Sequence, residues 1–306
     1  MPPDDLDLVR EVQRALGEIE RIRGRQCLAY TGNVIKGGET SIDSSDDLPF
    51  AEMIAAVPAG QRNVDVFLAT AGGSGQQVAR FVNCLRSRFD EVDFIIPSLC
   101  MSAGTLFALS GNRIWMTSRA YLGPIDPQVP TAAGRYVPAQ ALLLLVDELQ
   151  RQGERALKNG QNVPWTAVRI IDTIDKKELG EALTASAYSK TMAADFISTY
   201  KFRDWAIRET SKLAVTPEYR RQRAEEIANA LVQHERWKDH GHSISRDVLW
   251  NEIKLHIDAP MGDFERAILR AWAVYHWIFD KTMIFKMIVS ANYRFLKLLQ
   301  QAEKPK

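Results

Sequence analysis

Strand-like apolar runs in this chain repeatedly end at small residues and are followed by helix-like segments. The run VDVFLAT (64–70) stops at Ala-Gly-Gly-Ser-Gly and precedes the helix-period segment 76–89. The run VDFIIP (92–97) precedes a second such segment, and RIWMTS (113–118) follows as a third strand. Strands that alternate with helices predict crossover connections and a mostly parallel sheet. Because the runs are continuously apolar, we expect helices on both faces of that sheet.

The remaining segments predict helices around this α/β core. Apolar residues at helical spacing predict a helix over 4–24, ahead of a short strand at 25–32 and a loop at 35–49. From about residue 140 onward helix-period segments dominate; they cover 139–158, 165–172, 185–212, 217–233 and 261–300, with a strand-like piece at 253–258. Pro, Gly and Asp cluster near residue 260. We therefore predict an N-terminal helix (1–24), a core (25–260) and a C-terminal helical tail (261–306).

Composition narrows the class of protein. With 39 Lys and Arg against 38 Asp and Glu, the formal net charge is +1, which gives no global reason to bind nucleic acid or an anionic membrane. The three cysteines match no zinc or CxxC spacing and predict reduced thiols. The N-terminus lacks the features of a signal peptide, and no apolar run has the roughly 18 residues of a spanning helix. We expect a cytosolic protein without an integral membrane segment.

Two turns that follow consecutive strands could carry chemistry. Gly72 and Gly73 lie where backbone N–H groups can approach a ligand closely, as in a phosphate cradle or an oxyanion hole, although a plain tight turn has the same composition. Ser102 follows the next strand beside Ala103 and Gly104, and by itself it is typical of a helix N-cap. Both turns fall at the carboxyl ends of predicted parallel strands, the edge where open α/β sheets bind ligands.

The order of three motifs resembles a known family. LATAGGSG, CMSAGTLFALSG and then the turn Gly-Pro-Ile-Asp-Pro (123–127) are similar to the serine dehydrogenase proteinase family of the Clp protease/crotonase superfamily, which is akin to signal peptide peptidase A and NfeD-type proteases. The resemblance is strongest over 64–128 and continues to about 258, where 182–200 looks like the family's Lys-bearing helix. It does not cover 1–45 or 261–306.

The resemblance implies a fold, a site and partners. It implies an α/β, Clp protease/crotonase-like spiral of βαβ units, here with added helices at both ends. Ser102 would be the nucleophile, and the backbone N–H groups of Gly73 and Ala103 would hold the oxyanion. Gly72 and Asp126 would lie at the substrate-binding edge. Relatives of this kind imply a homo-oligomer and a regulatory or unfoldase partner.

The serine needs a base, and histidine is missing where Clp-type peptidases carry theirs. No His occurs between Ser102 and His234, so a Ser-Lys dyad is the better expectation. A lysine serves as base only where burial or a nearby cation lowers its pKa. The candidates are Lys158, Lys176, Lys177, Lys190 and Lys201. We select Lys190, because it matches the family's lysine and has small neighbours that allow close packing; a surface helix lysine is the alternative.

The histidines predict no metal centre. His240 and His242 form an HxH pair, but no further ligand cluster accompanies them, so a polar loop is the expected role and substrate contact is the alternative. We expect neither a metal nor another cofactor.

The resulting hypothesis is a serine peptidase with a Ser-Lys dyad that acts on extended polypeptide. The peptide would pair with the backbone near Gly72 and Gly73. Two alternatives stay open at this point: a crotonase-type acyl-thioester enzyme that uses the same two N–H groups, and a catalytically degenerate scaffold whose aromatic-rich tail binds a partner.

Overall fold

The computed structural model describes residues 5–36, 40–131, 134–208 and 211–299. Its centre is a six-stranded sheet with strand order β11-β10-β1-β2-β3-β5. The strands β1 (Gln26–Gly32), β2 (Asn63–Ala69), β3 (Glu91–Ile96) and β5 (Arg113–Met116) are parallel, whereas β10 (Ile284–Ser290) and β11 (Tyr293–Leu298) extend the sheet in antiparallel fashion. The α/β fold of successive βαβ units is therefore confirmed.

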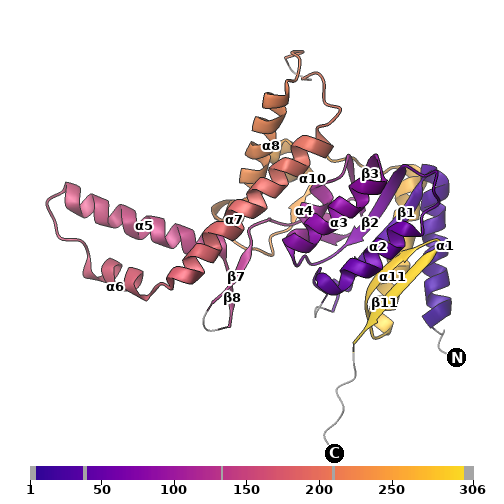
Figure 1. Ribbon diagram of the computed structural model, residues 1–306, viewed down its shortest axis with the longest axis horizontal. Coiled ribbons are helices and arrows are strands. Elements are labelled where there is room, and N and C mark those ends of the chain that lie inside the picture. Colours follow the sequence, from indigo (N-terminus) through magenta and orange to yellow (C-terminus); the bar gives the residue numbers. More distant parts are fainter. Residues whose placement is uncertain (1–4, 37–39, 132–133, 209–210, 300–306) are drawn as a thin grey trace, which may run out of the picture.

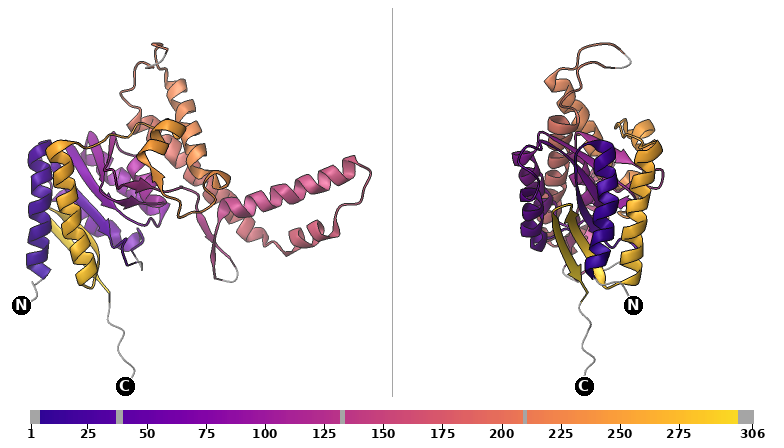
Figure 2. Two further views of the ribbon diagram at one scale, coloured as in Figure 1. Left: turned by 180° about the vertical axis from the view of Figure 1, so that it is seen from behind. Right: turned by 90° about the vertical axis from the view of Figure 1, so that its right-hand side faces the viewer.

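Helices cover both faces of the central sheet, as the continuous apolar strands predicted. Successive parallel strands add in one direction, so right-handed crossovers place α2 (Asp47–Ala55), α3 (Gly75–Arg88) and α4 (Ala103–Leu109) on one face. The helices α1 (Asp5–Arg23) and α11 (Gly262–Lys281) lie side by side on the other face (Figures 1 and 2). Side chains alternate between the two cores along each strand; Leu28 enters one and Ala29 the other.

A smaller sheet lies beyond the carboxyl ends of the parallel strands. It has the order β4-β6-β9, formed by β4 (Leu99–Cys100), β6 (Tyr121–Leu122) and β9 (Ile244–Ser245). The strands β4 and β6 are parallel, and β9 is antiparallel to β6. The chain therefore leaves β4 and β6, and enters β9, at the same end of this small sheet.

A helical arm projects away from the sheets. The hairpin β7 (Gln128–Pro130) and β8 (Tyr136–Pro138) leads into α5 (Ala139–Lys158), which is followed by α6 (Trp165–Thr173) and α7 (Lys176–Phe196). In Figures 1 and 2, α5 and α6 extend outward, and α7 returns along α5 to the body. The remaining elements are η1 (Ser44–Asp46), η2 (Ile197–Lys201), α8 (Pro217–Val232), α9 (His234–Trp237), α10 (Arg246–Val248) and η3 (Leu249–Ile253).

The structure corrects three predicted elements. The helix predicted over 261–300 ends at Lys281, and residues 284–298 form a β-hairpin that continues the central sheet beside β1. The helix predicted over 185–212 ends at Lys201, after a π-helical turn. The strand predicted at 253–258 makes only a single bridge, between Asp258 and Trp115. The division of the chain at residues 24 and 260 stays a prediction.

Candidate active site

The glycine turn after β2 adopts a backbone that only glycine fits. Gly72 and Gly73 have φ values of 109° and 137°, in the region that disfavours side chains. A Cβ on Gly72 would lie 2.8 Å from the Ser102 Cβ, and a Cβ on Gly73 would lie 2.4 Å from the Ile42 nitrogen. The turn is therefore pressed between the Ser102 segment on one side and the Ile42 segment on the other.

Ser102 precedes α4 with a strained backbone. Its φ of 51° and ψ of −119° are rare for a residue with a side chain. Its hydroxyl makes no capping hydrogen bond, whereas Ser74 in the corresponding position before α3 accepts one from the Gln77 N–H at 3.2 Å. The ordinary N-cap alternative therefore describes Ser74 and does not describe Ser102, which is a half-buried residue whose hydroxyl is not used for capping.

Two backbone N–H groups beside Ser102 are unpaired. The Gly72 N–H is taken by the Thr70 Oγ1 at 3.1 Å, and the Gly72 carbonyl accepts from the Ile42 N–H at 2.7 Å. Neither the Gly73 N–H nor the Ala103 N–H has an acceptor within the described chain. These are the two donors that the family resemblance implies for the oxyanion, and they belong to turns that are in direct contact. Their arrangement suits a developing negative charge on an acyl oxygen.

The GPIDP turn packs against the same segment. A Cβ on Gly123 would lie 2.6 Å from the Met101 Cε, and the Gly123 N–H donates to the Thr105 Oγ1 at 3.0 Å. The Thr105 Oγ1 lies 3.0 Å from the Cys100 carbonyl as well. These contacts bind the turn after β6 to the start of α4, next to Ser102.

Asp126 is fully buried at this edge and lies between two imidazoles. The Nδ1 of His240 is 2.9 Å from its Oδ1, and the Nδ1 of His234 is 3.5 Å from its Oδ2. Asp126 follows β6 and His240 precedes β9, so the smaller sheet brings both to the edge where Ser102 leaves β4. Sequence reasoning named both residues but missed their contact, because only the β6–β9 pairing reveals it.

Over the residues that the structure describes, no group of three or more His, Cys, Asp or Glu side chains could hold a metal ion. His242 is exposed and packs on the ring of Trp237, with ring centroids 5.2 Å apart.

Lys190 lies on α7, which packs against α4. Its neighbour Ser189 donates a 2.6 Å hydrogen bond to the Ile125 carbonyl, and the Met192 methyl lies 3.5 Å from the Cβ position of Gly75. Residue 190 is therefore flanked by contacts with the turn 123–127 and with the first residue of α3. Lys190 is half-buried, and in the described part of the chain its ammonium makes no hydrogen bond, to Ser102 Oγ or to any other group. Its role as the base stays a prediction.

The other candidate lysines are elsewhere. Lys201 lies by Asp93 near the start of β3, by Arg113 at the start of β5 and by Asp258, and burial lowers its pKa to about 8. These residues lie toward the amino-terminal ends of the parallel strands, whereas Ser102 lies beyond their carboxyl ends. Lys201 therefore cannot act as a base for Ser102. Lys158, Lys176 and Lys177 are exposed along the arm.

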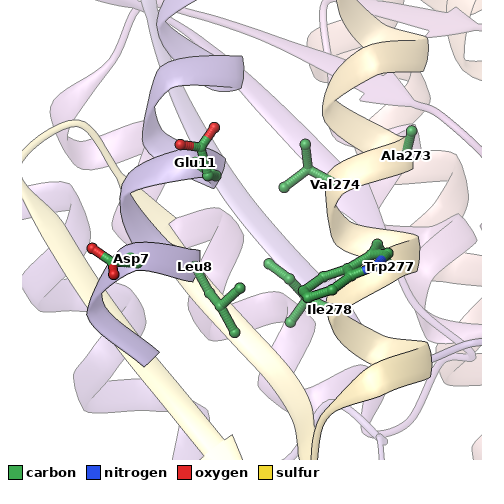
Figure 3. Close-up of a pocket in the computed structure, with 7 residues that line it drawn as sticks. All are labelled: Asp7, Leu8, Glu11, Ala273, Val274, Trp277 and Ile278. Carbon is green, nitrogen blue, oxygen red and sulfur yellow. The ribbon is translucent and has the colours of Figure 1, made fainter. Parts of the chain in front are cut away.

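A separate hollow lies far from these residues. It has a volume of about 520 Å³ between α1 and α11 and is lined by Leu8, Val274, Trp277 and neighbouring side chains (Figure 3). Both helices cover the sheet face opposite to α4. This hollow therefore has no part in the chemistry at Ser102.

The fold and the site define an α/β protein of successive βαβ units with a serine in a strained turn. Residues 11–155, just under half of the chain, match the family model of the ClpP-like SDH-type serine proteinases, which confirms the resemblance noted in the sequence. The match includes Gly72, Gly73, Ser102, Ala103 and Asp126. It does not reach Lys190.

Two curated relatives are uncharacterized proteins of Methanocaldococcus jannaschii. One is 32% identical over 99 residues, which cover 32% of this chain and 33% of the relative. The other is 30% identical over 152 residues, which cover 49% and 48%. The chain thus spans a third to about half of the length of these relatives.

Solved structures show a weaker likeness. The ClpP protease catalytic domain from Plasmodium falciparum is 12% identical with a TM-score of 0.25, over 27% of this chain and 49% of that one. A mutant of 1510-N, a membrane-bound stomatin-specific protease, in complex with a substrate peptide is 15% identical with a TM-score of 0.32, over 83% and 96%. No helix among the described residues is long and apolar enough to cross a membrane.

Proposed function

We propose that this chain is a serine peptidase in which Ser102 is the nucleophile and Lys190 is the general base. The observation that carries the proposal is the strained, uncapped Ser102 in contact with a glycine turn, with the unpaired N–H groups of Gly73 and Ala103 beside it. The match to a serine proteinase family supports this reading over a crotonase-type reaction or a degenerate scaffold.

The proposed reaction follows the acyl-enzyme route. Ser102 Oγ attacks the scissile carbonyl carbon, and its proton passes to the neutral amine of Lys190. The N–H groups of Gly73 and Ala103 hold the oxyanion until the C–N bond breaks. Lys190 then gives its proton to the departing amine. A water molecule then attacks the ester carbonyl carbon and loses a proton to Lys190. The bond between the acyl carbon and Ser102 Oγ breaks, and Lys190 returns the proton to Oγ, which regenerates Ser102 and the neutral amine.

The substrate we propose is an extended polypeptide. One edge of the glycine turn is already occupied, because the Ile42 N–H bonds the Gly72 carbonyl and the Ser74 N–H bonds the Ile42 carbonyl. A peptide would therefore pair at the opposite edge, where the Gly73 N–H is unpaired.

Three variants test the assignment against wild type. Wild type should react with an active-site serine probe and cleave unfolded protein, and Ser102→Ala should do neither. Lys190→Ala should lower kcat/KM by at least about a hundredfold, because general bases contribute that much. Lys201→Met, which changes a lysine at the opposite edge, should retain activity.

His240→Ala separates the two possible bases. If it abolishes probe labelling while Lys190→Ala does not, the base is the imidazole paired with Asp126. Probe labelling or cleavage that survives in Ser102→Ala would contradict the proposal as a whole, and binding of coenzyme A in calorimetry would favour the crotonase-type reading.

The proposal extends to partners and location. Exposed apolar side chains along α5, α6 and α7 support a homo-oligomer, as argued below. A cytosolic location and an unfoldase or other regulatory partner remain proposals from the sequence.

A further inference from the structure

A lysine in the C-terminal hairpin is completely buried beside residues 41–46, the segment that pairs with the glycine turn. Lys286 lies on β10 with no exposed surface. Its ammonium donates to the Ser41 carbonyl at 2.7 Å and to the Asp46 carboxylate at 2.7 Å. Burying an ammonium costs several kcal/mol unless such partners compensate, so this position is held by specific polar contacts.

Ser41 connects this lysine to the candidate active site. The next residue, Ile42, is buried, and its N–H and carbonyl hydrogen-bond to the Gly72 carbonyl and the Ser74 N–H at 2.7 and 2.8 Å. The Ile42 backbone also fills the space where Gly73 lacks a side chain. A shift of residues 41–42 would therefore move the Gly73 N–H directly.

The carboxylate partner holds the same segment from its other end. Asp46 Oδ2 accepts from the Asp43 N–H at 3.1 Å and from the Tyr30 hydroxyl at 2.7 Å. Lys286 thus links both ends of the segment 41–46 to the central sheet.

We propose that Lys286 is a positioning residue that holds the Gly73 N–H at the Ser102 site through Ser41 and Ile42. The inference rests on the proposed function, and it assigns to the C-terminal hairpin, which lies outside the family match, a part in the reaction. Lys286 touches neither substrate nor the reacting atoms.

Lys297 provides a matched control. Its ammonium contacts the same carboxylate, 2.6 Å from Asp46 Oδ1, from the next strand, β11. It makes no hydrogen bond to the Ser41 carbonyl in the described structure. Lys297→Met therefore removes the contacts with Asp46, Asp43 and Ser45 and keeps the link from Lys286 to Ser41.

The test compares Lys286→Met, Lys297→Met and the double variant Lys286→Met with Asp46→Asn. Lys286 and Lys297 balance the charges of Asp43 and Asp46, and Lys286→Met leaves this cluster one positive charge short. The double variant restores the balance, so it should restore stability lost in the single variant without restoring the donor to Ser41. We expect kcat on an unfolded substrate to fall between about tenfold and a hundredfold in both Lys286→Met proteins, with KM within about twofold. Lys297→Met should stay within about twofold of wild type.

Hydrogen exchange of residues 70–75 gives a readout that does not depend on activity. Exchange there should be faster in both Lys286→Met proteins than in wild type and Lys297→Met. A folded double variant with wild-type kcat would overturn the proposal. If wild type shows no Ser102-dependent activity, the proposed function fails, and exchange alone decides whether Lys286 positions the turn: unchanged exchange would refute that too.

Discussion

Gly72 is a residue of the candidate site that leaves no room for a side chain. Its φ of 109° already disfavours a side chain, and the added methyl of Gly72→Ala would lie 2.8 Å from the Ser102 Cβ and 2.9 Å from the Met101 carbonyl. We expect the unfolding free energy to fall by about 1–3 kcal/mol and probe labelling of Ser102 to be lost, because the clash displaces both turns.

Gly160 provides the control for that substitution. It has a φ of 66°, and no atom lies within 4 Å of its Cβ position. Gly160→Ala should therefore cost only about 1 kcal/mol, from backbone strain alone, and labelling should stay intact. Equal labelling and equal stability in the two variants, measured by probe reaction and urea unfolding, would contradict the close approach of Gly72 to Ser102.

Lys201 predicts a pH dependence of stability. Burial lowers its pKa from 10.5 in the unfolded chain to about 8 in the folded protein, against the opposing effect of Asp258 and Asp93 and with the help of Arg113. Between these pH values the unfolded chain binds more protons, so the unfolding free energy rises with pH, by up to about 3 kcal/mol.

Comparing wild type with Lys201→Met isolates this contribution. The difference in unfolding free energy between wild type and Lys201→Met should become more favourable to wild type from pH 8 to pH 10.5, as measured in urea. Other groups titrate in both proteins, so the difference isolates the contribution of Lys201. A difference that stays flat over this range would show that the Lys201 ammonium is solvated in the folded state.

At the scale of elements, strands buried on both faces were the most predictable part of the fold. The apolar runs 64–70, 92–97 and 113–118 each contain a strand, because length, β-forming residues and bounding turns agree. The turns after them could also be located, since Gly-Gly and Ser-Ala-Gly interrupt the apolar runs. Which amides stay unpaired could not be predicted, because that depends on Ile42, thirty residues earlier in the chain.

The C-terminal hairpin shows why one of the predicted elements was wrong. Residues 284–298 contain Phe, Met, Leu and Lys at spacings that also suit a helix, and the prediction extended the preceding helix through them. The structure ends that helix at Lys281 because β1 has an open edge, and Ile288 and Val289 pair with it. Tertiary pairing overrides local preference here. The buried Lys286 had no sequence signal, since a lysine within an apolar run normally indicates an exposed position.

At the scale of the whole molecule, the arm formed by α5, α6 and α7 exposes apolar side chains that no other part of the described chain covers. Helices were predicted at 139–158 and 165–172, and both are confirmed. An apolar stripe on a helix normally indicates a face packed on the body, yet α5 and α6 extend away from it (Figure 1). Trp165 is 74% exposed and Leu157 is 68% exposed. A nine-residue helix such as α6 is marginal in water without a packed face, so we expect this surface to be covered in solution.

We predict that a second copy of the chain buries the exposed apolar surface of the arm. Sedimentation equilibrium should give a mass above the 34.5 kDa of one chain, and the double variant Trp165→Ser with Leu157→Ser should weaken association by at least about tenfold, since exposed aromatic residues often dominate an interface. Trp250→Ser is the control, because Trp250 is 45% exposed and lies in η3, which is not part of the arm. A wild-type mass of one chain at all concentrations would contradict the prediction. Association that survives the arm variant and is lost in Trp250→Ser would move the interface from the arm to the surface around η3.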